Sequence, residues 1–133
     1  IQEYIEVIDH GFLDREQLAT CLKQVHVGLI PGVPEYQSQM KLFDYGAAKC
    51  LAIVPRVHNF NYWFNDSELE FFDPENSSSL AKVIKDIINS PEKIIHKGNR
   101  LYQKILNEFT WEKIFSKKAK IIKTLLIQGS DSY

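Results

Sequence analysis

Residues 38–55, with the sequence SQMKLFDYGAAKCLAIVP, place a basic and an acidic side chain near the start of a predicted helix. Lys41 and Asp44 are three residues apart and would share one helix face. The first turn of a helix also offers unpaired backbone N–H groups and the positive end of the helix dipole, which favour a bound anion. This combination suits a nucleotide diphosphate, with Lys41 on phosphate and Asp44 accepting hydrogen bonds from ribose hydroxyls. The alternative is a surface ion pair between Lys41 and Asp44 on an ordinary amphipathic helix.

The segments around this helix alternate between strands and helices, which predicts a parallel sheet covered by helices on both faces. The expected strands are four short apolar runs, residues 5–8, 26–30, 51–54 and 69–72. Ligands of such sheets bind beyond the carboxyl ends of the strands. The segments expected at that edge are loops at residues 9–14, 31–38 and 73–78, and a loop or short helix at residues 55–66.

Residues that commonly cap helices mark the expected helix starts. They are Asp14, Ser38, Ser90 and Thr110. Gln17 stands three residues after Asp14, as in a capping box. Ser38 would cap a helix over residues 39–49, and a further helix is expected from about residue 79 to 89.

The composition is that of an ordinary globular protein, and its 133 residues support one domain with a buried core. Because the net charge is only −1, no nucleic-acid partner is expected. Cys21 and Cys50 lie inside predicted elements and are interpreted as reduced packing residues. The histidines are too scattered to suggest a metal site. No apolar run has transmembrane length and no signal-peptide pattern opens the chain, which favours a cytoplasmic location.

Four blocks of the chain resemble successive blocks of glycosyltransferase family 4. They are residues 11–32, residues 41–55 (KLFDYGAAKCLAIVP), residues 68–88 and residues 108–112 (EFTWE). The resemblance covers about residues 5–125 and implies the C-terminal, nucleotide-sugar-binding half of a GT-B enzyme. That half has a Rossmann-like parallel sheet of strand order 3-2-1-4-5-6. This chain would supply only the last four strands in sequence, so residues 5–8 are not expected to pair with residues 26–30.

The resemblance implies roles for ten residues in binding the donor. Asp44 matches the family's ribose-binding glutamate, and Lys41 would contact phosphate. The remaining candidates are Phe12 at the nucleobase, Glu35 and Tyr36 at the donor sugar, Ser38, Gln39 and Met40 through backbone N–H groups on the diphosphate, and His58 and Asn59 in a phosphate-facing loop. Simpler interpretations are packing for Phe12 and His58, and a loop tip without a ligand for Glu35 and Tyr36. No catalytic residue is expected within this chain itself.

The chain also departs from the family pattern. Asp44 is one methylene shorter than the family's glutamate, and Gly46 replaces a methionine. The Gly-Lys-Pro that closes the helix is Lys49-Cys50-Leu51 here, and residues 56–59 (RVHN) stand where a Gly-Gly pair is usual.

The function that the resemblance implies is retaining transfer of a hexose from a UDP- or GDP-sugar to a saccharide or lipid-linked acceptor. Such transfer needs no metal and no cofactor, and polysaccharide biosynthesis is its expected setting. Residues 1–128 would form a partial donor-binding domain, followed by a flexible tail at residues 129–133. We expect the chain to be a piece of a longer enzyme, inactive without its N-terminal domain.

Peripheral association with the inner face of the membrane would come through the acceptor. The alternative function is that of a non-catalytic α/β interaction domain derived from a transferase-like fold. Losses of the glutamate, Gly-Gly and Gly-Lys-Pro favour that alternative somewhat.

Overall fold

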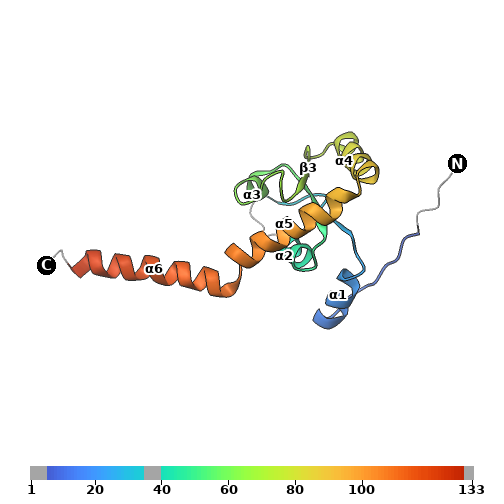
Figure 1. Ribbon diagram of the computed structural model, residues 1–133. Coiled ribbons are helices and arrows are strands. Elements are labelled where there is room, and N and C mark those ends of the chain that lie inside the picture. The colour runs from blue at the N-terminus through green and yellow to red at the C-terminus, as the bar shows by residue number, and fades with distance from the viewer. Residues whose placement is uncertain (1–5, 35–39, 131–133) are drawn as a thin grey trace.

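The computed structural model describes residues 6–34 and 40–130. Within these ranges helices and strands alternate through most of the chain, as Figure 1 shows. The elements are, in order, α1 (Arg15–Leu22), β1 (Val27–Leu29), α2 (Met40–Ala47), β2 (Leu51–Pro55), α3 (His58–Asn61), β3 (Glu70–Phe72), α4 (Ser77–Asn89), α5 (Glu92–Glu108) and α6 (Trp111–Ser130).

The three strands form one parallel sheet of order β1-β2-β3. In register, Val27 lies opposite Leu51, and Ile53 lies opposite both Leu29 and Glu70. The predicted strands over residues 26–30, 51–54 and 69–72 are therefore confirmed, as is their parallel direction. The helical crossovers that link them are what parallel pairing requires.

The strand predicted over residues 5–8 is wrong for the residues that the structure describes. Residues 6–8 have no regular structure, and the side chain of Val7 is 85% exposed. A strand needs a neighbour to accept and donate its backbone hydrogen bonds. The described part of the chain places no strand beside these residues, so their β-branched sequence is not enough. Residue 5 lies outside the described residues.

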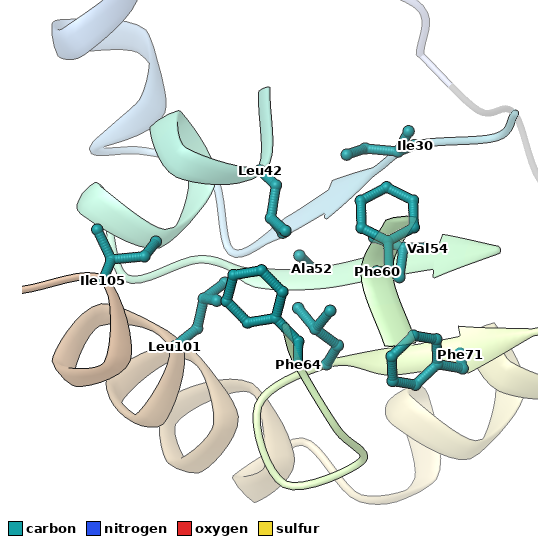
Figure 2. Packing of buried hydrophobic residues seen from close by; sticks show 10 residues of the cluster. Ile30, Leu42, Ala52, Val54, Phe60, Phe64, Phe71, Leu101 and Ile105 are labelled. Atoms are coloured by element: carbon teal, nitrogen blue, oxygen red, sulfur yellow. The ribbon is translucent and has the colours of Figure 1, made fainter. Parts of the chain in front are cut away.

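Helices cover both faces of the sheet. Successive side chains of β2 point to opposite faces and therefore enter two separate cores. Leu51 and Ile53 pack in a cluster with Ile87 of α4. Ala52 and Val54 face the larger cluster, which Figure 2 shows with side chains from α2, α5 and the segment around α3. All five residues of β2 are buried, as expected of a central strand of a doubly covered sheet.

Two glycines allow the larger core to close. A Cβ at Gly46 would lie 2.1 Å from Ile105 Cδ1, and a Cβ at Gly98 would lie 2.2 Å from the carbonyl oxygen of Lys49. The side-chain-free surfaces of α2 and α5 therefore approach closely. At Gly46, side chains of α5 occupy the space that a side chain would need.

The helix ends agree with the sequence to within a few residues. Asp14 caps α1, with both hydrogen bonds of the capping box to Gln17 present. Asn76 caps α4, which begins two residues earlier than expected. Pro91, not Ser90, precedes the first residue of α5. Thr110 Oγ1 accepts a hydrogen bond from the Lys113 N–H at 3.4 Å, at the start of α6.

The last helix ends beyond the boundary expected for the flexible tail. Helix α6 continues to Ser130, so its backbone includes the first two residues of the expected tail, while residues 131–133 lie outside the described residues.

Both cysteines are free, and the buried Cys50 Sγ lies 3.1 Å from the Val25 carbonyl oxygen. Cys50 is a buried packing residue, as interpreted, and Cys21 is half-buried.

Lys49, two residues after the end of α2, has the left-handed conformation, with φ of 61°. A residue with a Cβ pays about 1–2 kcal/mol there, and glycine does not. Lys49→Gly relieves this strain but loses the contact of Nζ with the Tyr102 ring, whose centroid is 4.8 Å away. We therefore expect a net rise in the free energy of unfolding of up to about 1 kcal/mol. Urea unfolding would measure this. Lys49→Ala keeps the strain and loses the contact, so it should destabilise; equal effects of the two variants would contradict the account.

An ion pair fastens α5 to β3. Lys97 Nζ lies 2.7 Å from Glu70 Oε1, and this contact is an ion pair without hydrogen-bond geometry. The same ammonium donates a hydrogen bond to the Leu69 carbonyl oxygen at 3.0 Å. The two side chains are only 15% and 17% exposed. We expect Lys97→Met to lower the free energy of unfolding by about 1–2 kcal/mol, because it leaves the Glu70 carboxylate poorly solvated. Adding Glu70→Met should recover much of the loss in a urea titration, and no recovery would show that the charge is not the cause.

Candidate functional site

The carboxyl edge of the sheet collects the segments that sequence analysis favoured. The three strands are parallel, so Leu29, Pro55 and Phe72 all end at this edge. Helix α2 ends just before β2 begins, and therefore its first turn lies at the opposite, carboxyl end. Met40 and Lys41 are in that turn, and both side chains are exposed.

Packing of α2 on the sheet turns Asp44 outward. Leu42 is buried, and the Tyr45 ring stands against Gly28, where a Cβ would lie 2.4 Å from Tyr45 Cδ2. The Tyr45 hydroxyl donates a hydrogen bond to the Leu29 carbonyl oxygen at 3.5 Å. Burial raises the pKa of Tyr45, and the nearby Cys50 and Asp44 raise it further, so this anchor stays neutral. Asp44, between these inward residues, is exposed.

Asp44 lines a groove of about 340 Å³ between α1 and α2. This volume is within the range of small-molecule sites. The groove has apolar walls with charged side chains among them, and its lining residues are Arg15, Leu18, Ala19, Leu22, Lys23, Asp44, Ala47 and Ala48. A carboxylate beside two cations and an apolar wall offers contacts for a ligand that carries hydroxyl, anionic and aromatic groups.

Lys41 and Asp44 do not form the surface ion pair of the simpler interpretation. Within residues 6–34 and 40–130, neither side chain makes an ion pair or a hydrogen bond. The same holds for Arg15 and Lys23 across the groove. In this part of the chain, the four charged groups are not neutralised by one another and are available to a ligand.

The segment after β2 forms a short helix in place of a glycine loop. Arg56 pairs with Asp66, with Nη2 2.6 Å from Oδ1, and its guanidinium lies 4.4 Å from the Phe71 ring centroid. The hydrogen bond from Arg56 lowers the pKa of the Asp66 carboxyl. His58 begins α3 with its ring exposed, 5.6 Å from the Tyr62 ring, while Asn59 is half-buried.

The other predicted site residues fall in different places. Phe12 is 96% exposed, so the core interpretation of this residue is wrong. Glu35, Tyr36, Ser38 and Gln39 lie outside the described residues. Of the ten candidates, the groove between α1 and α2 includes Asp44 among its described lining residues. Its grouping with Lys41, His58 and Asn59 in one cleft stays a prediction.

Arg15 and Lys23 are site residues that sequence analysis did not select. They lie eight residues apart and share a helix face with Leu18 and Leu22. The i, i+3, i+7, i+8 spacing was visible in the sequence. Only the capping box of this helix was used in the sequence analysis, although in the structure this face has charged ends and forms one wall of the groove.

The fold defines a class of domain: a parallel α/β domain of the kind that forms the C-terminal half of GT-B glycosyltransferases. A family model described as glycosyl transferase-like matches residues 2–117, and the chain belongs to that family.

Solved structures with this fold support the assignment of the fold. Sucrose-phosphate synthase from Thermosynechococcus elongatus is 19% identical with a TM-score of 0.73, and the match covers 89% of this chain and 30% of that one. The C-terminal domain of a glycosyl transferase group 1 family protein from Francisella tularensis is 12% identical with a TM-score of 0.64, covering 76% and 52%. The chain thus spans about a third to a half of these structures. No curated protein matches the sequence significantly.

Two further properties of the described residues bear on function. None of their helices is both long enough and apolar enough to cross a bilayer. They contain no group of three or more His, Cys, Asp or Glu side chains arranged to hold a metal ion.

Proposed function

We propose that this chain is the donor-binding part of a glycosyltransferase of family 4, acting on a UDP- or GDP-sugar. The observation that carries the proposal is Asp44: it is exposed and without a side-chain partner in the described chain, and it lines a groove at α2 in a glycosyl transferase-like domain. A carboxylate in this position would accept hydrogen bonds from two adjacent ribose hydroxyls. These bonds are strong because the acceptor is charged.

The chemistry of the proposed site is electrostatic. As the bond between sugar and phosphate breaks, negative charge builds up on the diphosphate. Lys41 and the N–H groups of the first turn of α2 stabilise that charge, because both favour an anion and both lie at the carboxyl edge of the sheet. The reaction would retain the anomeric configuration and would use no metal.

The acceptor would be bound by another part of the enzyme. We propose that an N-terminal GT-B domain closes over the donor and brings a saccharide or a lipid-linked acceptor to it, in polysaccharide assembly at the cytoplasmic face of the membrane. Catalysis needs donor and acceptor in a near-attack arrangement, which supplies several kcal/mol of the barrier. The 133-residue chain alone would therefore bind nucleotide without transferring sugar.

A second candidate function is that of a non-catalytic interaction domain. The segment after β2 favours it: Arg56 is held by Asp66 and by the Phe71 ring, and α3 occupies the place of the phosphate-facing glycine loop. The backbone N–H groups of Arg56, Phe60 and Asn61 donate to the carbonyl oxygens of Phe72 and Val57, which leaves fewer N–H groups of this segment for phosphate.

Transfer of radiolabelled sugar separates these functions. The assay compares the 133-residue chain with the longer protein, using UDP- and GDP-sugars and a membrane extract as acceptor. We expect transfer by the longer protein only. Transfer by the short chain would overturn the requirement for a second domain, and no transfer by either protein with any donor would favour the non-catalytic function.

A further inference from the structure

The groove between α1 and α2 has an arginine at one end. Arg15 is the first residue of α1, and its side chain is exposed. Asp14 and Gln17 form the capping box on either side of it, with hydrogen bonds of 3.0 and 2.9 Å, so its backbone is fixed. Within residues 6–34 and 40–130 its guanidinium makes no ion pair or hydrogen bond. A fixed arginine with this head group is available to a ligand in the groove.

Arg15 lies at the end of the groove that is nearest the carboxyl edge of the sheet. The other end of α1 is near the amino edge, because the Leu22 carbonyl oxygen lies 3.8 Å from the Sγ of Cys50, the residue just before β2. Lys23 follows Leu22 and is eight residues from Arg15, about 12 Å further along the helix. Ligands of parallel sheets bind at the carboxyl edge. Of these two cations, Arg15 is therefore the one that a donor nucleotide reaches.

A ribose held by Asp44 directs its base toward α1. The 2′- and 3′-hydroxyls are on one edge of the ribose ring, and the base and the 5′-diphosphate leave from the carbon atoms that flank the ring oxygen on the other edge. With the hydroxyls on Asp44 and the diphosphate at the first turn of α2, the base crosses the groove. The α1 wall offers it the apolar side chains of Leu18 and Ala19, with Arg15 at the carboxyl end.

We propose that Arg15 reads the nucleobase of the donor and selects guanine, so that the donor is a GDP-sugar. This inference rests on the proposed function, because it takes the ribose to be at Asp44. Guanine presents two adjacent acceptors, O6 and N7, and a planar guanidinium donates two parallel N–H groups to such a pair. Uracil has the single acceptor O4 on the corresponding edge, with a C–H beside it. Adenine has N7 beside an amino group, and this donor opposes one arm of the guanidinium.

Isothermal titration calorimetry of the 133-residue chain with a set of nucleoside diphosphates tests the selection. We expect GDP to bind about five- to 150-fold more tightly than UDP or ADP, which is the discrimination that one bidentate contact gives. Inosine diphosphate keeps O6 and N7 and should bind like GDP. In 7-deaza-GDP a C–H replaces N7, so most of the advantage over UDP should be lost.

Variants assign the selection to Arg15. Arg15→Gln should bring the ratio of GDP affinity to UDP affinity close to one. Arg15→Lys keeps the charge but loses the two parallel donors, so it should recover little of that ratio, whereas a contact with phosphate would survive this change. Arg100→Gln, at an exposed arginine of α5, is the matched control and should leave every affinity unchanged. Far-ultraviolet circular dichroism would show that each variant is folded.

Three results would overturn this inference alone, in a chain whose nucleotide binding Asp44→Ala weakens. The first is UDP or ADP binding at least as tightly as GDP. The second is a loss of affinity in Arg15→Gln that is equal for GDP, UDP and ADP, which would assign Arg15 to the phosphates or the ribose. The third is a preference for GDP that Lys23→Gln abolishes and Arg15→Gln leaves intact. If no nucleotide binds to the folded chain, the proposed function is wrong and this inference is wrong with it.

Discussion

Asp44→Ala is expected to weaken nucleotide binding about ten- to 150-fold, which corresponds to about 1.5–3 kcal/mol for hydrogen bonds to a charged group. The variant removes the proposed acceptor for the ribose hydroxyls and should leave the fold intact, because Asp44 is exposed and its side chain has no partner in the described residues. Isothermal titration calorimetry with the preferred nucleoside diphosphate would measure the change.

Two variants control for this experiment. Asp44→Glu keeps the carboxylate and should retain most of the affinity. Asp86→Ala removes an exposed carboxylate from α4, on the other face of the sheet, and should have no effect. An unchanged affinity in Asp44→Ala would show that the ribose role is wrong.

Gly98→Ala is expected to lower the free energy of unfolding by about 3 kcal/mol, at the upper end of overpacking costs. The new methyl group would lie 2.2 Å from the Lys49 carbonyl oxygen and 3.0 Å from its carbonyl carbon. These are backbone atoms at the end of α2, and they cannot move aside without shifting α2 and β2 against α5. The sign is informative, because the same change in an open helix interior stabilises by about 1 kcal/mol.

Gly32→Ala provides the matched control for this prediction. A Cβ at Gly32 would have no atom within 4 Å, so the change should be near neutral. Urea unfolding followed by tryptophan fluorescence would measure both variants. If Gly98→Ala proves as stable as the wild type, α5 does not pack on the end of α2 as described.

The sheet was predictable because its signals are local. The apolar run from Leu51 to Val54 fits a strand buried on both faces, and the structure buries every residue of β2. Asp14 and Gln17 formed the expected capping box, which needs only residues three apart. Val7 shows the limit of such signals: its β-branched neighbourhood indicated a strand, yet pairing depends on a neighbour elsewhere in the chain.

The contacts between helices were not predictable from the pattern. Gly46 was noted only as a departure from the family, and its meaning came from Ile105, 59 residues away in sequence. The ion pair of Glu70 with Lys97 likewise joins a strand to a distant helix. Neither pairing leaves a periodic signal in the sequence.

The candidate site was partly predictable. The spacing of Lys41 and Asp44 indicated two charged groups on one helix, and the structure exposes both side chains. The opposite wall of the groove, with Arg15 and Lys23, depends on how α1 is rotated against α2, which the spacing within α1 does not fix. The short helix α3 fits the expectation of a loop or short helix at residues 55–66, whereas the contacts of Arg56 with Asp66 and Phe71 left no signal in the sequence.

The central claim is that this domain binds a nucleoside diphosphate, and thermal unfolding with UDP, GDP and ADP tests it most directly. A ligand that binds only the folded state at about 100 times its Kd raises the free energy of unfolding by about 2.7 kcal/mol. The account predicts a clear rise in Tm with UDP or GDP that Asp44→Ala reduces and Asp44→Glu largely retains. A folded chain whose Tm is unchanged by all three nucleotides at millimolar concentration would contradict it.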